Sequence, residues 1–148
     1  MSTATTALSG ELAAKSAENI LEIRGLTLNF KAGGNTIHAL RGVDLTLANG
    51  EILAIVGESG SGKSVTGLSI LRLHGKTATM AGSINFRGRD LIGLDEEEMR
   101  SYRGGKIAMI FQEPMTALNP VFTVGFQLAE VLKLHCNLDR AAAEKRSI

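Results

Sequence analysis

The chain has 148 residues, which is room for one domain with one hydrophobic core. Its formal net charge of +1 argues against a general electrostatic attraction to nucleic acid or to anionic lipid. The single cysteine, Cys136, excludes an intramolecular disulfide bond, and no apolar run approaches the ~20 residues that cross a membrane. The sequence therefore predicts a cytoplasmic polypeptide that reaches a membrane only through a partner.

The N-terminal third of the chain predicts a tail followed by a β-hairpin. Residues 1–19 are rich in Ser, Thr and Ala and show no strand alternation, which predicts a mobile tail. Apolar residues alternate over 20–30, with a bend expected at Gly25, and again over 37–47. Because Gly33-Gly34-Asn35 between them is typical of a turn, we expect the two strands to pair as a hairpin.

A glycine-rich loop follows. Residues 57–64 read Gly-Glu-Ser-Gly-Ser-Gly-Lys-Ser and fit the P-loop (Walker A) pattern at every fixed position. The apolar run at 52–56 before it predicts a buried parallel strand, and residues 65–73 after it predict a helix capped by Gly75. The alternative is a glycine-rich turn that binds nothing, which the flanking strand and helix disfavour.

The residue types of this loop suit polyphosphate. Gly57, Gly60 and Gly62 are expected to let the backbone adopt positive φ and come close to an anion, and the helix N-terminus favours negative charge. Lys63 is expected to act on the β- and γ-phosphates as a catalytic cation, and the Ser64 hydroxyl to contact Mg²⁺. The predicted nucleotide-binding residues are Gly57, Glu58, Ser59, Gly60, Ser61, Gly62, Lys63, Ser64 and Val65. The Lys63→Ala variant should lose nucleotide binding.

Two further elements lead to a polar strand end. Residues 81–88 predict a short strand and turn, and Asp95 is the expected N-cap of a helix that Gly104-Gly105 ends. The acids of the first turn, 96–98, are expected to be a solvated helix start and not a metal cluster. The run 107–111 predicts another buried strand that ends in Gln112. Gln112 either reaches the metal or the attacking water, or is merely a polar strand terminus.

The C-terminal part predicts two helices. Thr123 is the expected N-cap of an amphipathic helix whose apolar positions are Val124, Leu128, Val131 and Leu132, and this helix is expected to pack in a helical subdomain. Asp139 is the expected N-cap of the next helix. His74 and His135 have no metal-ligand spacing.

These motifs together resemble the ATP-binding subunit of an ATP-binding-cassette (ABC) transporter. The matching stretches are 39–45, 50–53, 57–64 and 110–114, and the resemblance covers about residues 20–148. The segment Phe-Gln-Glu-Pro-Met-Thr-Ala-Leu-Asn-Pro at 111–120 is similar to the dipeptide and oligopeptide permease branch, which also serves nickel and glutathione importers.

The resemblance implies an α/β fold of the P-loop NTPase type, an ABC-type nucleotide-binding domain that is truncated. An antiparallel hairpin would lie on its N-terminal side, and a helical subdomain would begin near its C-terminal end. Gln112 would begin the Q-loop, a catalytic and Mg²⁺-binding position that also contacts the membrane subunit. An aromatic residue of the early strands would stack on adenine, which points to Phe30, or to His38 in the same region; ordinary core packing is the alternative for Phe30.

The resemblance also implies ATP and Mg²⁺ as ligands. Its implied partners are a second ATP-binding subunit and membrane permease subunits at the cytoplasmic face of the inner or plasma membrane, and no nucleic acid. The implied function is the ATP-binding component of an importer that couples ATP hydrolysis to transport of peptides or related small solutes. One alternative is a non-hydrolytic fragment that at most binds nucleotide. Another is a soluble ABC-type ATPase, which the permease-like segment at 111–120 disfavours.

The departures from the family concern motifs that lie downstream of the Q-loop. The signature motif, the acidic strand with a catalytic Glu and the switch His are not found in these residues, and Glu113 is not that Glu. Phe126 stands where relatives of the branch often carry an acidic residue. We therefore expect an N-terminal part of a nucleotide-binding domain, with residues 1–19 as tail and 20–148 as partial domain. Such a chain should not hydrolyse ATP alone and should tend to aggregate.

Overall fold

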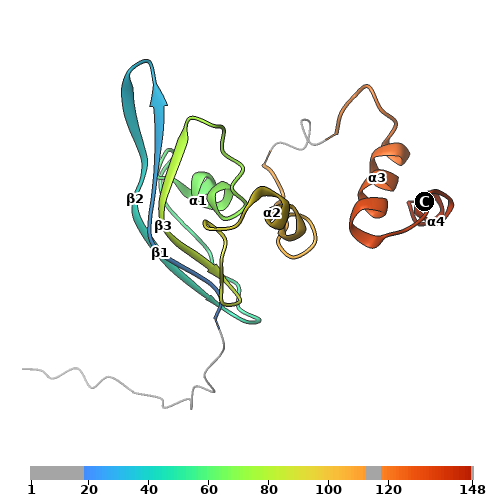
Figure 1. Cartoon of the computed structure of the whole chain (residues 1–148), viewed down its shortest axis with the longest axis horizontal. Helices are drawn as coiled ribbons and strands as arrows, with labels where there is room; N and C mark the ends of the chain where they lie inside the picture. The colour runs from blue at the N-terminus through green and yellow to red at the C-terminus, as the bar shows by residue number, and fades with distance from the viewer. Residues whose placement is uncertain (1–18, 113–117, 148) are drawn as a thin grey trace, which may run out of the picture. The chain divides into compact units, whose positions relative to one another are not determined.

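The computed structural model describes residues 19–112 and 118–147 (Figure 1). The described chain divides into two compact units. The first unit contains the residues up to Lys63 together with Lys76–Ile92, and the second contains Ser64–Gly75 together with the residues from Gly93 onward. The predicted tail, apart from Asn19, lies outside the described residues.

The first unit is built on an antiparallel sheet with the strand order β2-β1-β3-β4 (Figure 1). The strands are β1 (Asn19–Ala32), β2 (Asn35–Ala48), β3 (Ala78–Phe86) and β4 (Arg89–Asp90). The predicted hairpin and its turn are confirmed. The strand predicted at 81–88 is confirmed as β3, which begins three residues earlier, and the turn leads into β4.

A β-bulge in β1 keeps its apolar residues on the core face. Leu21 and Ile23 are buried before the bulge, and Leu26 and Leu28 are buried after it. The buried positions change from odd-numbered to even-numbered residues because the strand register shifts between Ile23 and Leu26, where Gly25 adopts φ +54°. Asp44 Oδ1 accepts a hydrogen bond from the Gly25 N–H at 2.8 Å, so the unpaired bulge amide is satisfied. The predicted bend at Gly25 is confirmed.

The helices are α1 (Lys63–Ile70), α2 (Glu96–Tyr102), α3 (Val124–Cys136) and α4 (Arg140–Arg146). The N-caps predicted for the last three are confirmed, because the side chains of Asp95, Thr123 and Asp139 each accept a backbone hydrogen bond from their helix. No helix among the described residues is both long and apolar enough to cross a membrane.

The two predicted buried strands at 52–56 and 107–111 are not strands in this structure. Residues 51–58 carry no regular secondary structure, and Ile107 makes only an isolated bridge to Arg103. Ile52 and Val56 are 97% and 89% exposed. A parallel strand needs hydrogen-bond partners from elsewhere in the chain, and residues 52–56 have none among the described strands.

The end of α1 also differs from the prediction. The helix closes with Arg72 in the left-handed region at φ +51°. The Arg72 N–H donates to Ser69 O and the Leu73 N–H donates to Leu68 O, both at 3.0 Å, which is the hydrogen-bond pattern of a Schellman motif. The expectation that Gly75 caps this helix is therefore wrong, because the turn is made three residues earlier by a non-glycine residue.

The predicted amphipathic helix exists as α3 and packs against α4, although several of its apolar side chains stay exposed. Ala129 is its buried residue, whereas Val124, Leu128, Val131 and Leu134 are exposed. Phe122 stacks on Phe126, with ring centroids 5.1 Å apart. The apolar side of this helix thus finds little cover within the described chain.

Candidate nucleotide-binding site

The P-loop is shaped by glycines that no other residue could replace without strain. Gly60 and Gly62 adopt φ +82° and +96°, which L side chains rarely tolerate. A side-chain carbon added to Gly62 would lie 2.8 Å from the Leu40 Cδ2 atom. Gly57 does not adopt positive φ, so the prediction is wrong for its dihedral; what Gly57 provides is space, because an added carbon would lie 2.7 Å from Ser61 Oγ.

Leu40 was not among the candidate residues, although it supports the loop from β2. Its side chain is 4% exposed and lies directly against the Gly62 position. The sequence carries no signal for this contact, because it depends on how the loop folds against β2.

Lys63 places its ammonium group against the loop. Nζ donates to Gly57 O at 2.8 Å and to Glu58 O at 2.7 Å, and it lies 3.4 Å from Ser61 Oγ. These three acceptors all belong to residues 57–61, so the loop wraps around the cation. The site thereby combines one positive charge with the glycine backbone, which is the donor chemistry that polyphosphate requires.

The N-terminus of α1 adds to this positive character. The helix begins at Lys63 and carries no acidic residue in its first turn. No carboxylate of the helix itself therefore offsets the positive end of its dipole, which favours an anion. Ser64 is exposed and Val65 is half-buried at the start of the helix.

The segment that leads to Gln112 lies against α1. The Met109 Cε atom is 3.7 Å from the point where a side chain on Gly67 would begin. Gln112 itself is exposed. Ser64 and Gln112 both belong to the second unit, whereas Gly57–Lys63 and Phe30 belong to the first.

The acids at the start of α2 behave as the sequence indicated. Asp95 caps the helix and residues 96–98 lie exposed in its first turn. Within residues 19–112 and 118–147, no group of three His, Cys, Asp or Glu side chains could hold a metal ion. The prediction of a solvated helix start is confirmed.

The two adenine-stacking candidates, Phe30 and His38, differ in the face of the hairpin on which they lie. Phe30 pairs with Ile37 across the hairpin, and His38 pairs with Asn29. Because neighbouring strand residues point to opposite faces and cross-strand partners share one face, Phe30 and His38 lie on opposite faces of the hairpin. His38 Nδ1 is 2.6 Å from Asn29 Oδ1. A purine ring on one face can therefore contact only one of the two.

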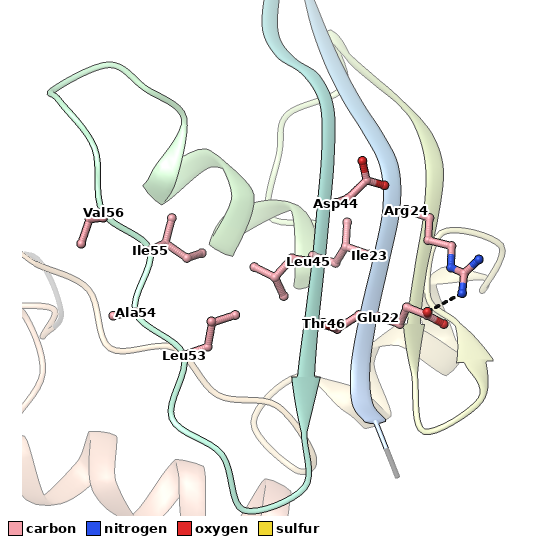
Figure 2. Close-up of a pocket in the computed structure, with 10 residues that line it drawn as sticks. All are labelled: Glu22, Ile23, Arg24, Asp44, Leu45, Thr46, Leu53, Ala54, Ile55 and Val56. Carbon is pink, nitrogen blue, oxygen red and sulfur yellow. Dashed lines mark hydrogen bonds and ion pairs between the residues drawn. The ribbon is translucent and has the colours of Figure 1, made fainter. Parts of the chain in front are cut away.

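A hollow in the first unit lies beside the sheet. It encloses about 750 Å³ between the hairpin and residues 53–56, and no glycine of the P-loop lines it. Leu53 and Ile55 point toward Leu45 across this space, and Glu22 and Arg24, which also line it, form an ion pair (Figure 2). Its lining combines apolar side chains with the charged or polar Glu22, Arg24, Asp44 and Thr46.

Comparisons with known proteins identify the family of the chain. The family described as ABC transporter matches residues 40–146, and the chain therefore belongs to the ABC transporter family. The chain is 48% identical over 134 residues to the probable peptide ABC transporter ATP-binding protein y4tR of Sinorhizobium fredii. It is also 48% identical over 131 residues to the oligopeptide transport ATP-binding protein OppD of Bacillus subtilis. The predicted resemblance to the peptide branch is confirmed.

The alignments cover 89% and 87% of this chain but only 40% and 37% of these two relatives, so the chain matches well under half of their length. The structure resembles the ATP-binding cassette MJ0796, solved as a dimer in a post-hydrolysis state bound to ADP and Pi. The TM-score is 0.72 at 28% identity, over 86% of this chain and 53% of the cassette. The predicted ABC-type α/β fold is confirmed.

Proposed function

We propose that this chain supplies the ATP-binding part of an ABC importer that couples ATP hydrolysis to uptake of peptides or related small solutes. The observation that carries the proposal is the P-loop with Lys63 Nζ enclosed by its carbonyls, in a chain 48% identical to peptide transport ATP-binding proteins. Residues 20–148 would form part of the ATP-binding domain. Partners would be a second ATP-binding subunit and membrane permease subunits at the cytoplasmic face of the membrane.

The loop and α1 would bind the phosphates. The backbone N–H groups of Gly57, Gly60 and Gly62 would contact the phosphate oxygens, and Lys63 would neutralise the negative charge. The remaining members of residues 57–65 (Glu58, Ser59, Ser61, Ser64 and Val65) complete the loop and the first turn of the helix. The cassette MJ0796, whose structure is similar, was solved with ADP and Pi.

Ser64 and Gln112 would hold Mg²⁺. A hydroxyl and an amide oxygen are hard, uncharged donors of the kind that Mg²⁺ accepts while it keeps several waters. When bound, Mg²⁺ supplies Lewis-acid stabilisation of charge on the phosphate oxygens. Gln112 can orient the attacking water, but it cannot take a proton from it, because an amide does not ionise as a base.

Phe30 is our candidate for adenine stacking, because it is an aromatic residue and half-buried. Phe30→Ala should weaken ATP binding while leaving inorganic triphosphate binding unchanged. His38→Ala serves as the control on the opposite face. If His38→Ala weakens ATP binding and Phe30→Ala does not, His38 is the residue that stacks on adenine.

Peptide uptake tests the proposal directly. Cells whose only copy of the gene carries Lys63→Ala should lose uptake of labelled di- and oligopeptides, whereas Lys76→Ala should leave it unchanged. Normal peptide uptake in the Lys63→Ala cells would contradict the proposed function.

A further inference from the structure

Arg103 contacts the end of α1 from another part of the chain. Its Nε donates to Leu71 O at 2.8 Å, and its second terminal nitrogen lies 3.3 Å from Arg72 O. Helix carbonyls at this end have no intrahelical partner and carry the negative end of the dipole. The Arg103 guanidinium therefore caps α1 across a sequence separation of 32 residues, with its side chain only 23% exposed.

The same arginine forms hydrogen bonds near both ends of α2. Its other terminal nitrogen pairs with Glu96 in the first turn, and this hydrogen bond lowers the pKa of the Glu96 carboxyl. The Arg103 backbone N–H donates to Met99 O at 3.2 Å and closes the helix. A second hydrogen bond links the end of α1 to the start of α2: the Arg72 guanidinium donates to Leu94 O just before α2.

Arg103 is also where the chain turns toward Gln112. Its backbone forms a bridge with Ile107, and the Gly104 N–H donates to Ile107 O at 2.9 Å. From there the chain passes Gly67 of α1 at Met109 and reaches Gln112. One residue thus joins the far end of α1 to the start of the segment that ends in Gln112.

We propose that Arg103 is a positioning residue that fixes the Ser64 hydroxyl relative to the Gln112 amide, and so sets the Mg²⁺ site. The physical reason is that α1 has eight residues and a length of about 12 Å, so an anchor at its C-terminal end controls the direction of its N-terminal end. This inference rests on the proposed function, in which these two side chains contact Mg²⁺. No sequence motif marked Arg103, because its contacts depend on the fold.

The test is the affinity for ATP measured with Mg²⁺ and again with EDTA, by equilibrium dialysis of labelled ATP. In Arg103→Ala, the gain in affinity that Mg²⁺ provides should fall about tenfold, as expected when an outer support of a metal site is lost. The affinity in EDTA should change by less than about twofold. Arg103→Lys should lose an intermediate amount, because one ammonium cannot reproduce the planar fork that serves two carbonyls and Glu96.

Arg100→Ala is the matched control, since Arg100 lies exposed in the last turn of the same helix. It should leave both affinities unchanged. Equal losses with and without Mg²⁺ in Arg103→Ala would show general structural damage and overturn the inference, as would an unchanged Mg²⁺ effect. If Arg103→Ala fails to fold by circular dichroism, Arg103→Lys decides by the same criterion. A wild-type protein that binds no ATP in either condition would instead defeat the proposed function.

Discussion

The sheet of the first unit and the segment at 52–56 are both rich in apolar residues, yet only the sheet buries them. Ile23 in β1 is 1% exposed, whereas Ile52 is 97% exposed. β1 has β2 on one side, joined through a short turn, and β3 on the other. Residues 52–56 have no strand beside them among the described residues.

Antiparallel and parallel strands differ in the connection that brings their partner alongside. An antiparallel partner can follow after a tight turn, while a parallel partner must return through a longer crossover. β1 and β2 pair down to Ala32 and Asn35, on either side of the turn. In the relatives, well over half of the length lies outside the matched region.

The largest effect should come from a matched pair of isoleucines. Ile23→Ala removes a fully buried side chain and should lower the free energy of unfolding by about 2–5 kcal/mol. Ile52→Ala removes an exposed one and should change it by less than about 0.5 kcal/mol. Urea unfolding of the 148-residue chain measures the change in the free energy of unfolding for both variants. Equal losses would show that burial does not distinguish the sheet from residues 52–56.

Two glycines test how tightly the strands of the sheet approach each other. Gly82 in β3 and Gly42 in β2 share φ +100°, but an added carbon on Gly82 would lie 2.6 Å from Arg24 O and Gly25 O, while Gly42 faces open space. Gly82→Ala should cost about 3 kcal/mol from strain and overlap, and Gly42→Ala about 1 kcal/mol from strain alone. Thermal unfolding distinguishes them; similar losses would mean that the close approach at the bulge is absent.

A smaller effect is expected at a helix cap, where the stabilising contact is local. The Asp95 carboxylate accepts the Glu98 N–H at 2.8 Å. Asp95→Ala should lower stability by about 1 kcal/mol, and Asp95→Asn should recover most of it, because Asn is also a good N-cap. If Asn and Ala behaved alike in chemical denaturation, the capping bond would not be the source of the effect.

The smallest effect concerns pH. Burial lowers the pKa of His74 below its ordinary value of 6.5, and its Nε2 lies 2.9 Å from the buried Ser69 hydroxyl. Because the folded pKa is depressed, the stabilising contribution is present above about pH 6.5 and is lost as the pH falls through the folded pKa. His74→Gln should flatten the stability profile between about pH 5 and pH 7. A profile identical to that of the wild type would exclude His74 as the cause.

The features that the sequence predicted correctly depend on near neighbours. The turn at Gly33-Gly34-Asn35, the bend at Gly25 and the caps at Asp95, Thr123 and Asp139 each form within a few residues or one hairpin. The P-loop pattern likewise predicted where glycines with positive φ occur, at Gly60 and Gly62.

The features that could not be predicted from the sequence depend on contacts between residues far apart in the chain, or on which of several local turns forms. The run at 52–56 has strand propensity, but propensity cannot supply the partner strand. Arg72 ends α1 in a conformation that glycine usually adopts, so Gly75 was the natural but wrong choice. The opposite faces of Phe30 and His38 follow from the hairpin register, and the capping of α1 by Arg103 follows from tertiary structure.

The central claim is that the loop at 57–64 binds ATP through Lys63. Its most direct test is the dissociation constant of Mg²⁺-ATP for the wild type, Lys63→Ala and Lys76→Ala. Lys63→Ala should weaken binding by about 100-fold or more, because it loses a charged hydrogen bond to the phosphates. Lys76→Ala should bind Mg²⁺-ATP with the affinity of the wild type. Equal affinity of the wild type and Lys63→Ala would contradict the claim.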